Sequence, residues 1–221
     1  MNTEQARFNM IEQQIRPWEV LDQGVLSLLS VVRREDFVPP QHRALAFFDT
    51  EVPLREAGRA GQAMLAPKVE ARLLQALQLA RHERVLEVGA GSGYMAALLA
   101  HKAQHVVTLE IEPDLAAMAA ASLRHAGVVN AAVRQADGAC GLADEAPFDA
   151  IVLSGSVAAV PQVLLDQLKL GGRLVAIVGL EPMMCALLVT RVAPAQFKRV
   201  ELFDTVAPRL LGFPEPPAFR F

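Results

Sequence analysis

Short apolar runs, separated by longer stretches with helical spacing, fill most of the chain from residue 84 onward. Each run is 4–10 residues long and is bounded by turn-forming residues, which predicts strands at 84–88, 105–110, 131–134, 149–154, 172–179, 184–193 and 198–205. Apolar positions at helical spacing predict helices over 94–102, 115–125 and 160–168. This alternation of strands and helices predicts an α/β fold with a doubly wound, mostly parallel sheet of seven strands.

The last two predicted strands differ from the others because no helix separates them. Only Ala193-Pro194-Ala195-Gln196 connects them, which is too short for a parallel crossover, so they should form an antiparallel hairpin at the sheet edge. Gly171-Gly172 follows the predicted helix 160–168 after two intervening residues. We expect this glycine pair to end that helix through a left-handed cap.

The first third of the chain shows helical spacing without strands. Helices are predicted over 4–14, 19–32 and 67–79, with Pro17 in the first turn of the second and residues 41–60 irregular. We therefore expect one domain over 1–221, divided into a helical segment (1–75), a sheet (76–212) and a Pro-rich surface tail (213–221).

Composition limits the classes of function. A hydrophobic content of 52% over 221 residues allows a substantial core, while a net charge of −3 argues against a general nucleic-acid binder. The apolar runs are too short for a membrane span, and the N-terminus has no signal-peptide pattern. Cys140 and Cys185 form no metal or redox motif, which favours a cytoplasmic setting. His101 and His105 should lie on different elements, so we expect no metal site.

Residues 84–94, Arg-Val-Leu-Glu-Val-Gly-Ala-Gly-Ser-Gly-Tyr, carry the strongest functional signal. The buried strand ends in three alternate glycines, Gly89, Gly91 and Gly93, and a helix follows at once. Glycines allow sharp turns and a close approach of the backbone to a ligand, and a helix N-terminus directs free N–H groups toward the same place. The pattern predicts a nucleotide-type pocket, although a strand-to-helix turn without a ligand would show the same glycines.

The glycine spacing distinguishes between two classes of cofactor-binding site. Dinucleotide-binding proteins favour G-x-G-x-x-G, whereas this chain has Glu87-x-Gly89-x-Gly91-x-Gly93. This pattern resembles motif I of the S-adenosylmethionine-dependent methyltransferases. The resemblance implies a Rossmann-like methyltransferase fold. It also implies that the cofactor is bound by Glu87 and by the loop residues Gly89, Ala90, Gly91, Ser92 and Gly93.

Two acidic positions downstream support a nucleoside site. Glu110 lies 21 residues after Gly89, at the end of the second predicted strand, where a carboxylate typically holds the ribose hydroxyls. We expect Glu110 and the adjacent Ile111 to contact the cofactor, although a strand end can also simply be solvated. Asp137 and Gly138 resemble the acidic position beside the adenine, but Asp-Gly is also an ordinary turn signal.

The whole chain resembles the protein-L-isoaspartate O-methyltransferases over roughly residues 5–212. Motif I matches the family pattern almost residue for residue. The other matching stretches are Arg33-Arg34-Glu35-Asp36-Phe37-Val38-Pro39, Gly61-Gln62-Ala63-Met64-Leu65-Ala66-Pro67, Ala146-Pro147-Phe148-Asp149-Ala150-Ile151-Val152 and 167–175.

The resemblance implies a specific reaction. Members of this family use S-adenosyl-L-methionine, release S-adenosyl-L-homocysteine, and methylate the α-carboxylate of L-isoaspartyl residues in damaged proteins and peptides. An acceptor carboxylate is already ionised at neutral pH, since a free Asp side chain titrates at about 4, so no general base is required. Positioning of the acceptor oxygen is then the main task of the protein.

One loop departs from the family pattern. The family places Ser or Thr beside the transferring methyl group, and this position falls on Leu65, with the preceding Thr position on Ala63. Neither side chain can donate a hydrogen bond. Candidate replacement donors are Arg55, Arg59, the backbone of Gly61 and Gln62, and the hydroxyl of Ser154 or Ser156.

The missing hydroxyl leaves three functions open. The chain could be a repair methyltransferase with Gln62, Ala63 and Leu65 at the reaction centre, a methyltransferase for another carboxylate or small-molecule acceptor, or a non-catalytic protein that binds S-adenosylmethionine. Arg209 could face the pocket or lie on a solvated edge, and Tyr94 could contact the cofactor loop or simply pack in the core. The sequence predicts no oligomeric state.

Overall fold

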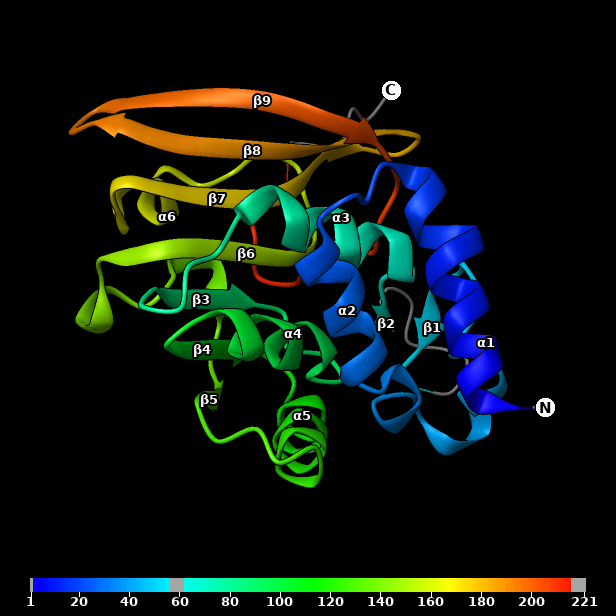
Figure 1. Ribbon diagram of the computed structural model, residues 1–221. Helices are drawn as coiled ribbons and strands as arrows, with labels where there is room; N and C mark the ends of the chain where they lie inside the picture. Colours follow the sequence, from blue (N-terminus) through cyan, green and yellow to red (C-terminus); the bar gives the residue numbers. More distant parts are fainter. Residues whose placement is uncertain (1, 56–61, 216–221) are drawn as a thin grey trace, which may run out of the picture.

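Seven strands form one sheet in the computed structural model, which describes residues 2–55 and 62–215 (Figure 1). The strand order is β5-β4-β3-β6-β7-β8-β9. The bounds are β3 Arg84–Val88, β4 His105–Glu110, β5 Ala131–Gln135, β6 Phe148–Val157, β7 Leu168–Leu180, β8 Met183–Ala193 and β9 Gln196–Asp204. Neighbours from β5 to β7 are parallel, while β8 and β9 run antiparallel. The predicted α/β sheet and its edge hairpin are therefore confirmed.

Alternate residues of the central strands pack into two separate cores. In β6, Ala150 and Val152 belong to one core, and Ile151 and Leu153 belong to the other. Successive side chains of a strand point to opposite faces of a sheet, so both faces are covered. The first core contains residues of α3 (Pro67–Leu77), α4 (Tyr94–Lys102) and α5 (Pro113–His125), and the second contains those of α6 (Gln162–Asp166).

The N-terminal segment packs on the first of these cores. It comprises α1 (Thr3–Asn9), a π-helical stretch (Met10–Ile15), a 3₁₀ turn (Arg16–Trp18) and α2 (Gln23–Val31), which lie beside the sheet in Figure 1. Met10, Ile15 and Leu29 are buried in one cluster with Val85 of β3. Helical and sheet segments thus share a core.

The second N-terminal helix begins later than predicted. Glu19 has a left-handed backbone with φ 63°, so it cannot be helical, and Pro17 lies in the preceding 3₁₀ turn. The carboxylate of Asp22 accepts from the backbone N–H of Val25 and caps the helix instead. The prediction of a helix from residue 19 was wrong by one turn, because this cap and the left-handed residue fix the start.

A small two-stranded sheet was not predicted. Two 3₁₀ turns (Arg34–Asp36 and Pro40–Leu45) lead into β1 (Val52–Pro53), which pairs antiparallel with β2 (Ala63–Met64). Each strand has only two residues, too few for any sequence periodicity. The pairing continues to Leu54, whose backbone N–H donates to the carbonyl of Gln62 at 3.0 Å, and Figure 1 shows both short strands near α3.

The glycine pair 171–172 does not cap a helix. Helix α6 ends at Asp166 with Gln167 in right-handed conformation, and Gly171, with φ 78°, lies inside β7. The pairing of β6 with β7 shifts from Phe148↔Leu168 to Ala150↔Arg173 at this point. The glycine pair therefore allows a bulge in β7, and the left-handed backbone of Gly171 belongs to this bulge and not to a helix end.

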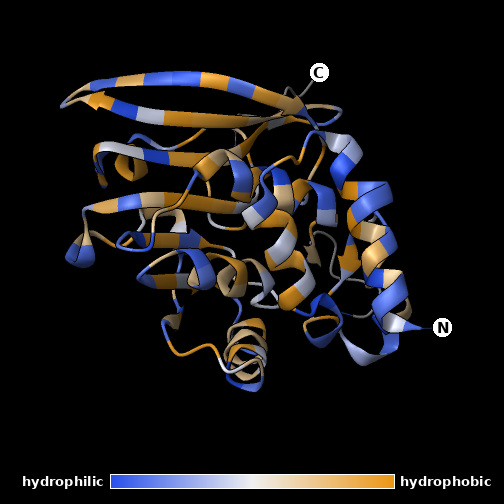
Figure 2. Ribbon diagram, viewed as in Figure 1, coloured by the Kyte–Doolittle hydropathy of each residue, from blue (hydrophilic) through white to orange (hydrophobic). Residues whose placement is uncertain are grey.

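The edge and the C-terminal segment complete the fold. Hydrophilic and hydrophobic residues are interspersed along β9, and its residues are exposed or half-buried (Figure 2). Phe213 is buried at 7% exposure in the second core, so a surface tail beginning at residue 213 was wrong at that residue, and 216–221 lie outside the described residues. Within the described ranges, no helix is long and apolar enough to cross a membrane.

Candidate active site

The glycine loop turns the chain from β3 into α4. Gly89, Gly91 and Gly93 have φ values of 91°, 51° and 85°, a region that other residues rarely adopt. A side chain on Gly93 would lie 3.1 Å from the carbonyl oxygen of Ala119 in α5. Gly93 therefore permits close helix packing, while Gly89 and Gly91 line the adjoining cavity.

Glu110 is fixed against this loop. Its Oε2 accepts from the backbone N–H of Gly91 at 2.8 Å, and its Oε1 accepts from that of Glu112 at 3.1 Å. The side chain is 6% exposed and lines the cavity. These two bonds hold a carboxylate at the end of β4, as the sequence predicted.

A cavity of about 590 Å³, partly open to solvent, surrounds Glu110. We call it the large pocket. Its lining combines apolar and small residues with one carboxylate, a composition that small-molecule sites often have. The described lining is Leu54, Gln62, Ala63, Val88, Gly89, Gly91, Leu109, Glu110, Ile111, Leu115, Ala136, Gly138, Ser154 and 208–211. The predicted residues Gln62, Ala63, Ile111 and Gly138 are among them.

Asp137 does not line the large pocket. Its Oδ1 accepts from the backbone N–H of Ala139 at 2.9 Å, and its oxygens lie next to the Cα of Gly212. The side chain thus caps a 3₁₀ turn (Gly138–Cys140). A side chain on Gly138 would clash with Cγ1 of Val88, so glycine at this position allows the neighbouring segment to lie close to β3.

The sequence left the C-terminal segment undecided, and the structure brings it into the large pocket. Ser156 holds this segment: its backbone N–H donates to Pro208 at 2.7 Å, and Leu210 donates back to its carbonyl at 2.9 Å. Arg209 lines the pocket, while one of its terminal nitrogens donates to the carbonyl of Gly179 at 3.0 Å. No local sequence signal indicates this long-range pairing.

A second cavity of about 270 Å³, which we call the small pocket, adjoins the large one. Both are lined by Leu54, Ala63, Gly89, Gly91 and Ser154, so the two spaces meet at the glycine loop. The remaining lining of the small pocket is Met64, Leu65, Glu70, Glu87, Ala90, Ser92, Tyr94 and Met95. Glu87, Ala90 and Ser92 therefore belong to this side of the loop.

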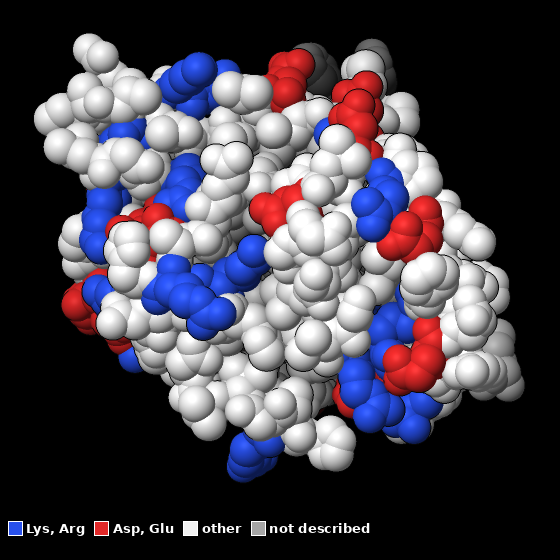
Figure 3. Space-filling view, in the orientation of Figure 1, with Lys and Arg blue, Asp and Glu red and all other residues white. Residues whose placement is uncertain are grey.

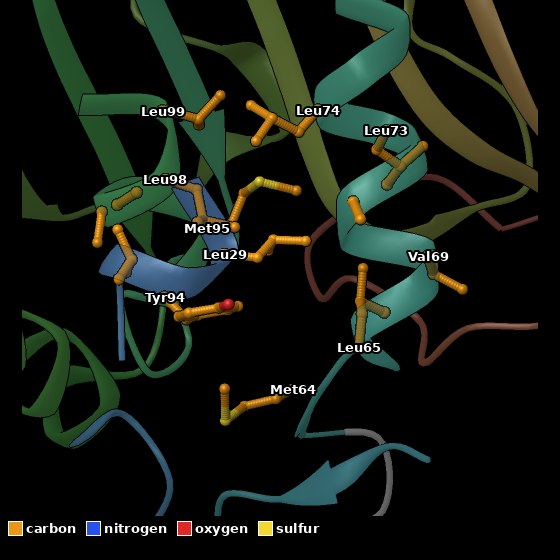
Figure 4. Packing of buried hydrophobic residues seen from close by; sticks show 14 of the residues in the cluster. Leu29, Met64, Leu65, Val69, Leu73, Leu74, Tyr94, Met95, Leu98 and Leu99 are labelled. Carbon is orange, nitrogen blue, oxygen red and sulfur yellow. The ribbon is translucent and has the colours of Figure 1, made fainter. Parts of the chain in front are cut away.

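Leu65 lies at the junction of β2 and α3. Its side chain is 4% exposed, and its carbonyl accepts from a terminal nitrogen of Arg34 at 2.8 Å. Figure 4 shows Leu65 at the start of α3, with the ring of Tyr94 pointing toward it from α4. Tyr94 is buried against Phe37 and Arg34, so it both packs in the core and lines the small pocket.

The replacement donors proposed from sequence differ in their positions and in their hydrogen-bond partners. Ser154 lines both pockets, but its hydroxyl donates to Oε1 of Glu87 at 2.6 Å. Arg55 pairs with Glu112 and Asp114 at the start of α5. Gln62 faces the large pocket, and its Oε1 has no hydrogen-bond partner among the described residues. Arg59 and Gly61 lie outside the described residues.

Glu87 and Glu70 are buried acidic groups in the small pocket. Burial raises the pKa of Glu87 to about 8, although the Ser154 hydroxyl favours the ionised form. Burial likewise raises the pKa of Glu70 to about 7, opposed by Arg34, whose guanidinium donates to its Oε2. Sequence analysis missed Glu70, which lies on the apolar face of α3 with Leu73, Leu74 and Leu77.

The raised pKa of Glu87 predicts a pH-dependent stability. Between about pH 4.5 and 8 the folded state retains a proton that the unfolded state releases, so stability falls as pH rises through this window. Glu87→Gln cannot ionise and should lose less stability than the parent between pH 5.5 and 8, by about 2–3 kcal/mol. Urea unfolding of the cofactor-free protein measures this, with the exposed Glu201→Gln as control. Parallel pH curves for parent and Glu87→Gln would contradict it.

Comparison with known proteins identifies the family. A profile described as Protein-L-isoaspartate(D-aspartate) O-methyltransferase (PCMT) matches residues 5–201. A Koribacter versatilis protein named protein-L-isoaspartate O-methyltransferase is 39% identical over 206 residues, 93% of this chain and 90% of its own length. A protein of the same name from Rhodopseudomonas palustris is 42% identical over 204 residues, 92% of each chain.

Solved structures agree on the fold. A Plasmodium falciparum protein described as a protein-L-isoaspartate O-methyltransferase, crystallised with S-adenosyl-L-homocysteine, superposes with a TM-score of 0.79 at 20% identity, covering 95% of this chain and 98% of its own. Another protein-L-isoaspartate O-methyltransferase structure gives 0.78 at 24% identity. Sequence and fold together show that this chain belongs to the protein-L-isoaspartate O-methyltransferase family.

Proposed function

We propose that this protein transfers a methyl group from S-adenosyl-L-methionine to the α-carboxylate of L-isoaspartyl residues in proteins and peptides. The observation that carries the proposal is the carboxylate of Glu110, held by the Gly91 N–H at the wall of a cavity that continues past the glycine loop to Leu65. The family relationship supplies the acceptor class. The cytoplasmic location and the division into segments stay predictions.

The described residues fit this cofactor. Glu110 would hold the ribose hydroxyls, Ile111 and Leu115 offer apolar contact to a base, and Gly89 and Gly91 leave space for a close approach of the ligand. When bound, S-adenosylmethionine supplies a methyl group on a positively charged sulfur, which the acceptor oxygen takes while the electrons of the carbon–sulfur bond stay on sulfur. The protein's own task is to orient the acceptor and exclude water.

Two measurements test the proposal. Calorimetric titration with S-adenosylmethionine tests the cavity, and absence of both heat and a thermal shift would refute cofactor binding. Methyl transfer to an isoaspartyl peptide, with the ordinary aspartyl peptide as control, tests the acceptor class. Cofactor binding without transfer to either peptide would favour one of the two alternatives, a different acceptor or a non-catalytic protein, for which the apolar Leu65 is the supporting observation.

Leu65→Ser is expected to raise transfer to the isoaspartyl peptide by about ten- to a hundredfold. The new hydroxyl would supply one hydrogen bond to a charged oxygen, worth about 1.5–3 kcal/mol, and each 1.36 kcal/mol corresponds to a tenfold rate. Leu65→Ala is the matched control, since it opens the same space without a hydroxyl. Equal rates for the two variants would show that the hydroxyl is not what the parent lacks.

On the face shown in Figure 3, Lys and Arg side chains lie among Asp and Glu side chains. A net charge of −3 accompanies this mixed surface. Proteins that bind nucleic acid non-specifically usually present a continuous basic field. The face shown presents no such continuous field, which accords with the prediction of a protein or peptide acceptor.

A further inference from the structure

The C-terminal segment contributes the positive charge of the site. Among the described residues that line the large and small pockets, Arg209 is the one Lys or Arg. The other ionisable carboxyl groups on these walls, those of Glu70, Glu87 and Glu110, are acidic. The acceptor of the proposed reaction is a carboxylate as well, and a charged group that leaves water needs a partner of opposite charge. Arg209 is therefore the residue whose charge matches the acceptor.

The backbone on both sides of Arg209 is fixed. Ser156, near the end of β6, exchanges backbone hydrogen bonds with Pro208 and Leu210. The side chain of Leu210 reaches the glycine loop, since a Cβ on Gly89 would lie 2.7 Å from its Cδ2. Arg209 lies between these two anchored residues. Its place at the pocket wall consequently does not depend on the contacts of its own side chain.

The guanidinium of Arg209 is only partly satisfied. Its Nη2 donates to the carbonyl of Gly179 at 3.0 Å, and its Nε lies 3.0 Å from Oε1 of Glu215. Its Nη1 is buried and forms no hydrogen bond with any described residue. A buried donor without a partner costs free energy that an incoming acceptor oxygen can recover.

Glu215 supplies a carboxylate from the same chain. Its side chain is 48% exposed, and within the described ranges Arg209 is the only residue with which it forms an ion pair. Phe213, buried in the second core, anchors the segment two residues earlier. Exposed ion pairs contribute little to stability, so this carboxylate can leave Arg209 at a small cost.

We propose that Arg209 binds the α-carboxylate of the isoaspartyl acceptor, and that Glu215 occupies the same guanidinium in the free protein. Arginine presents planar N–H donors that match a carboxylate. Leu65 offers no hydroxyl to orient the acceptor, so the donor must come from another segment. The exchange of one carboxylate for another keeps the charge of Arg209 paired. The inference rests on the proposed function and assigns the acceptor contact to a residue outside the glycine loop.

Calorimetric titration of the protein saturated with S-adenosylhomocysteine tests this contact. Two peptides of one sequence are compared, the first with the isoaspartyl α-carboxylate and the second with an α-carboxamide in its place. Arg209→Met should weaken binding of the carboxylate peptide by about ten- to a hundredfold and leave the carboxamide peptide unchanged, because only the first loses a charge-assisted hydrogen bond. Arg199→Met, at an exposed position of β9, is the matched control.

A purely structural role for Arg209 predicts a different result. Loss of the hydrogen bond to Gly179 would displace the segment, and both peptides and S-adenosylhomocysteine would then bind more weakly together. Equal losses for the two peptides, or no loss for either, overturn the proposal. Arg209→Lys keeps the charge without the planar donors, so it should recover part of the preference for the carboxylate peptide.

Glu215→Gln tests the exchange at a half-exposed position and needs no change at Arg209. Removal of the competing carboxylate should tighten binding of the carboxylate peptide by about two- to fivefold, as expected for an exposed ion pair, and leave the carboxamide peptide unchanged. An unchanged or weaker affinity overturns the exchange, even if Arg209→Met fails to fold. A parent protein that binds both peptides equally well overturns the assignment of Arg209, whereas one that binds S-adenosylhomocysteine but neither peptide refutes the proposed function.

Discussion

Glu110→Ala is expected to weaken S-adenosylmethionine binding by about a hundred- to ten-thousandfold. Each hydrogen bond from a ribose hydroxyl to this carboxylate is worth about 1.5–3 kcal/mol, and the loss of two such bonds, at 1.4 kcal/mol per tenfold, gives this range. Glu110 is already oriented by the backbone N–H groups of Gly91 and Glu112, so the free protein holds it ready for the ligand. Calorimetric titration measures the change directly.

The variant also removes a contact that shapes the glycine loop, and a second substitution separates the two effects. Glu110→Gln retains an oxygen that can accept from Gly91 but removes the negative charge. We expect it to bind with an affinity between those of the parent and Glu110→Ala. If Glu110→Ala binds within threefold of the parent, Glu110 does not hold the ribose, and the assignment of the large pocket to a nucleoside is wrong.

The parts of the site that follow from local pattern were predictable from sequence. The glycine loop and Glu110 lie at the ends of neighbouring parallel strands, and parallel strands in one sheet bring such ends together. The alternation of strands and helices along the chain likewise predicted the mostly parallel sheet. These predictions succeed because short-range periodicity is imposed by burial on both faces of the sheet.

The parts that depend on distant residues were not predictable. Nothing near Ser156 indicates that it will hold Pro208 and Leu210, and this pairing brings a C-terminal segment to the large pocket. The left-handed turn at Glu19 and the two-residue strands β1 and β2 have no periodicity to detect. Gly171 has the left-handed backbone expected of a helix cap, but it lies within β7, where the pairing with β6 shifts register.

Glu70 is the case in which a sequence signal was present and overlooked. An acidic residue at position 70 shares the face of α3 with Leu73, Leu74 and Leu77, a pattern that places a carboxylate toward the core. A charge in such a place needs a buried partner. Arg34 satisfies that requirement, and it is 36 residues away in sequence.

This pairing leads to the largest expected effect on stability. Arg34→Met should lower the free energy of unfolding by about 3–5 kcal/mol, because removal of one member of a buried pair leaves the other charge uncompensated. Arg34 has no exposed surface, and the carbonyl of Leu65 would also lose its donor. For a chain of this size each kcal/mol corresponds to about 2–4 °C, so the midpoint should fall by roughly 6–20 °C.

Two further variants show whether the pair itself is responsible. Arg33→Met is the matched control, since the neighbouring Arg33 has a side chain 58% exposed, and it should cost less than about 1 kcal/mol. Arg34→Met combined with Glu70→Met removes both charges, and apolar replacement of a buried ion pair is often neutral, so the double variant should recover more than half of the loss. If the double variant is as unstable as Arg34→Met alone, the stability comes from the hold of Arg34 on the Leu65 carbonyl, and Glu70 is then free of a structural role.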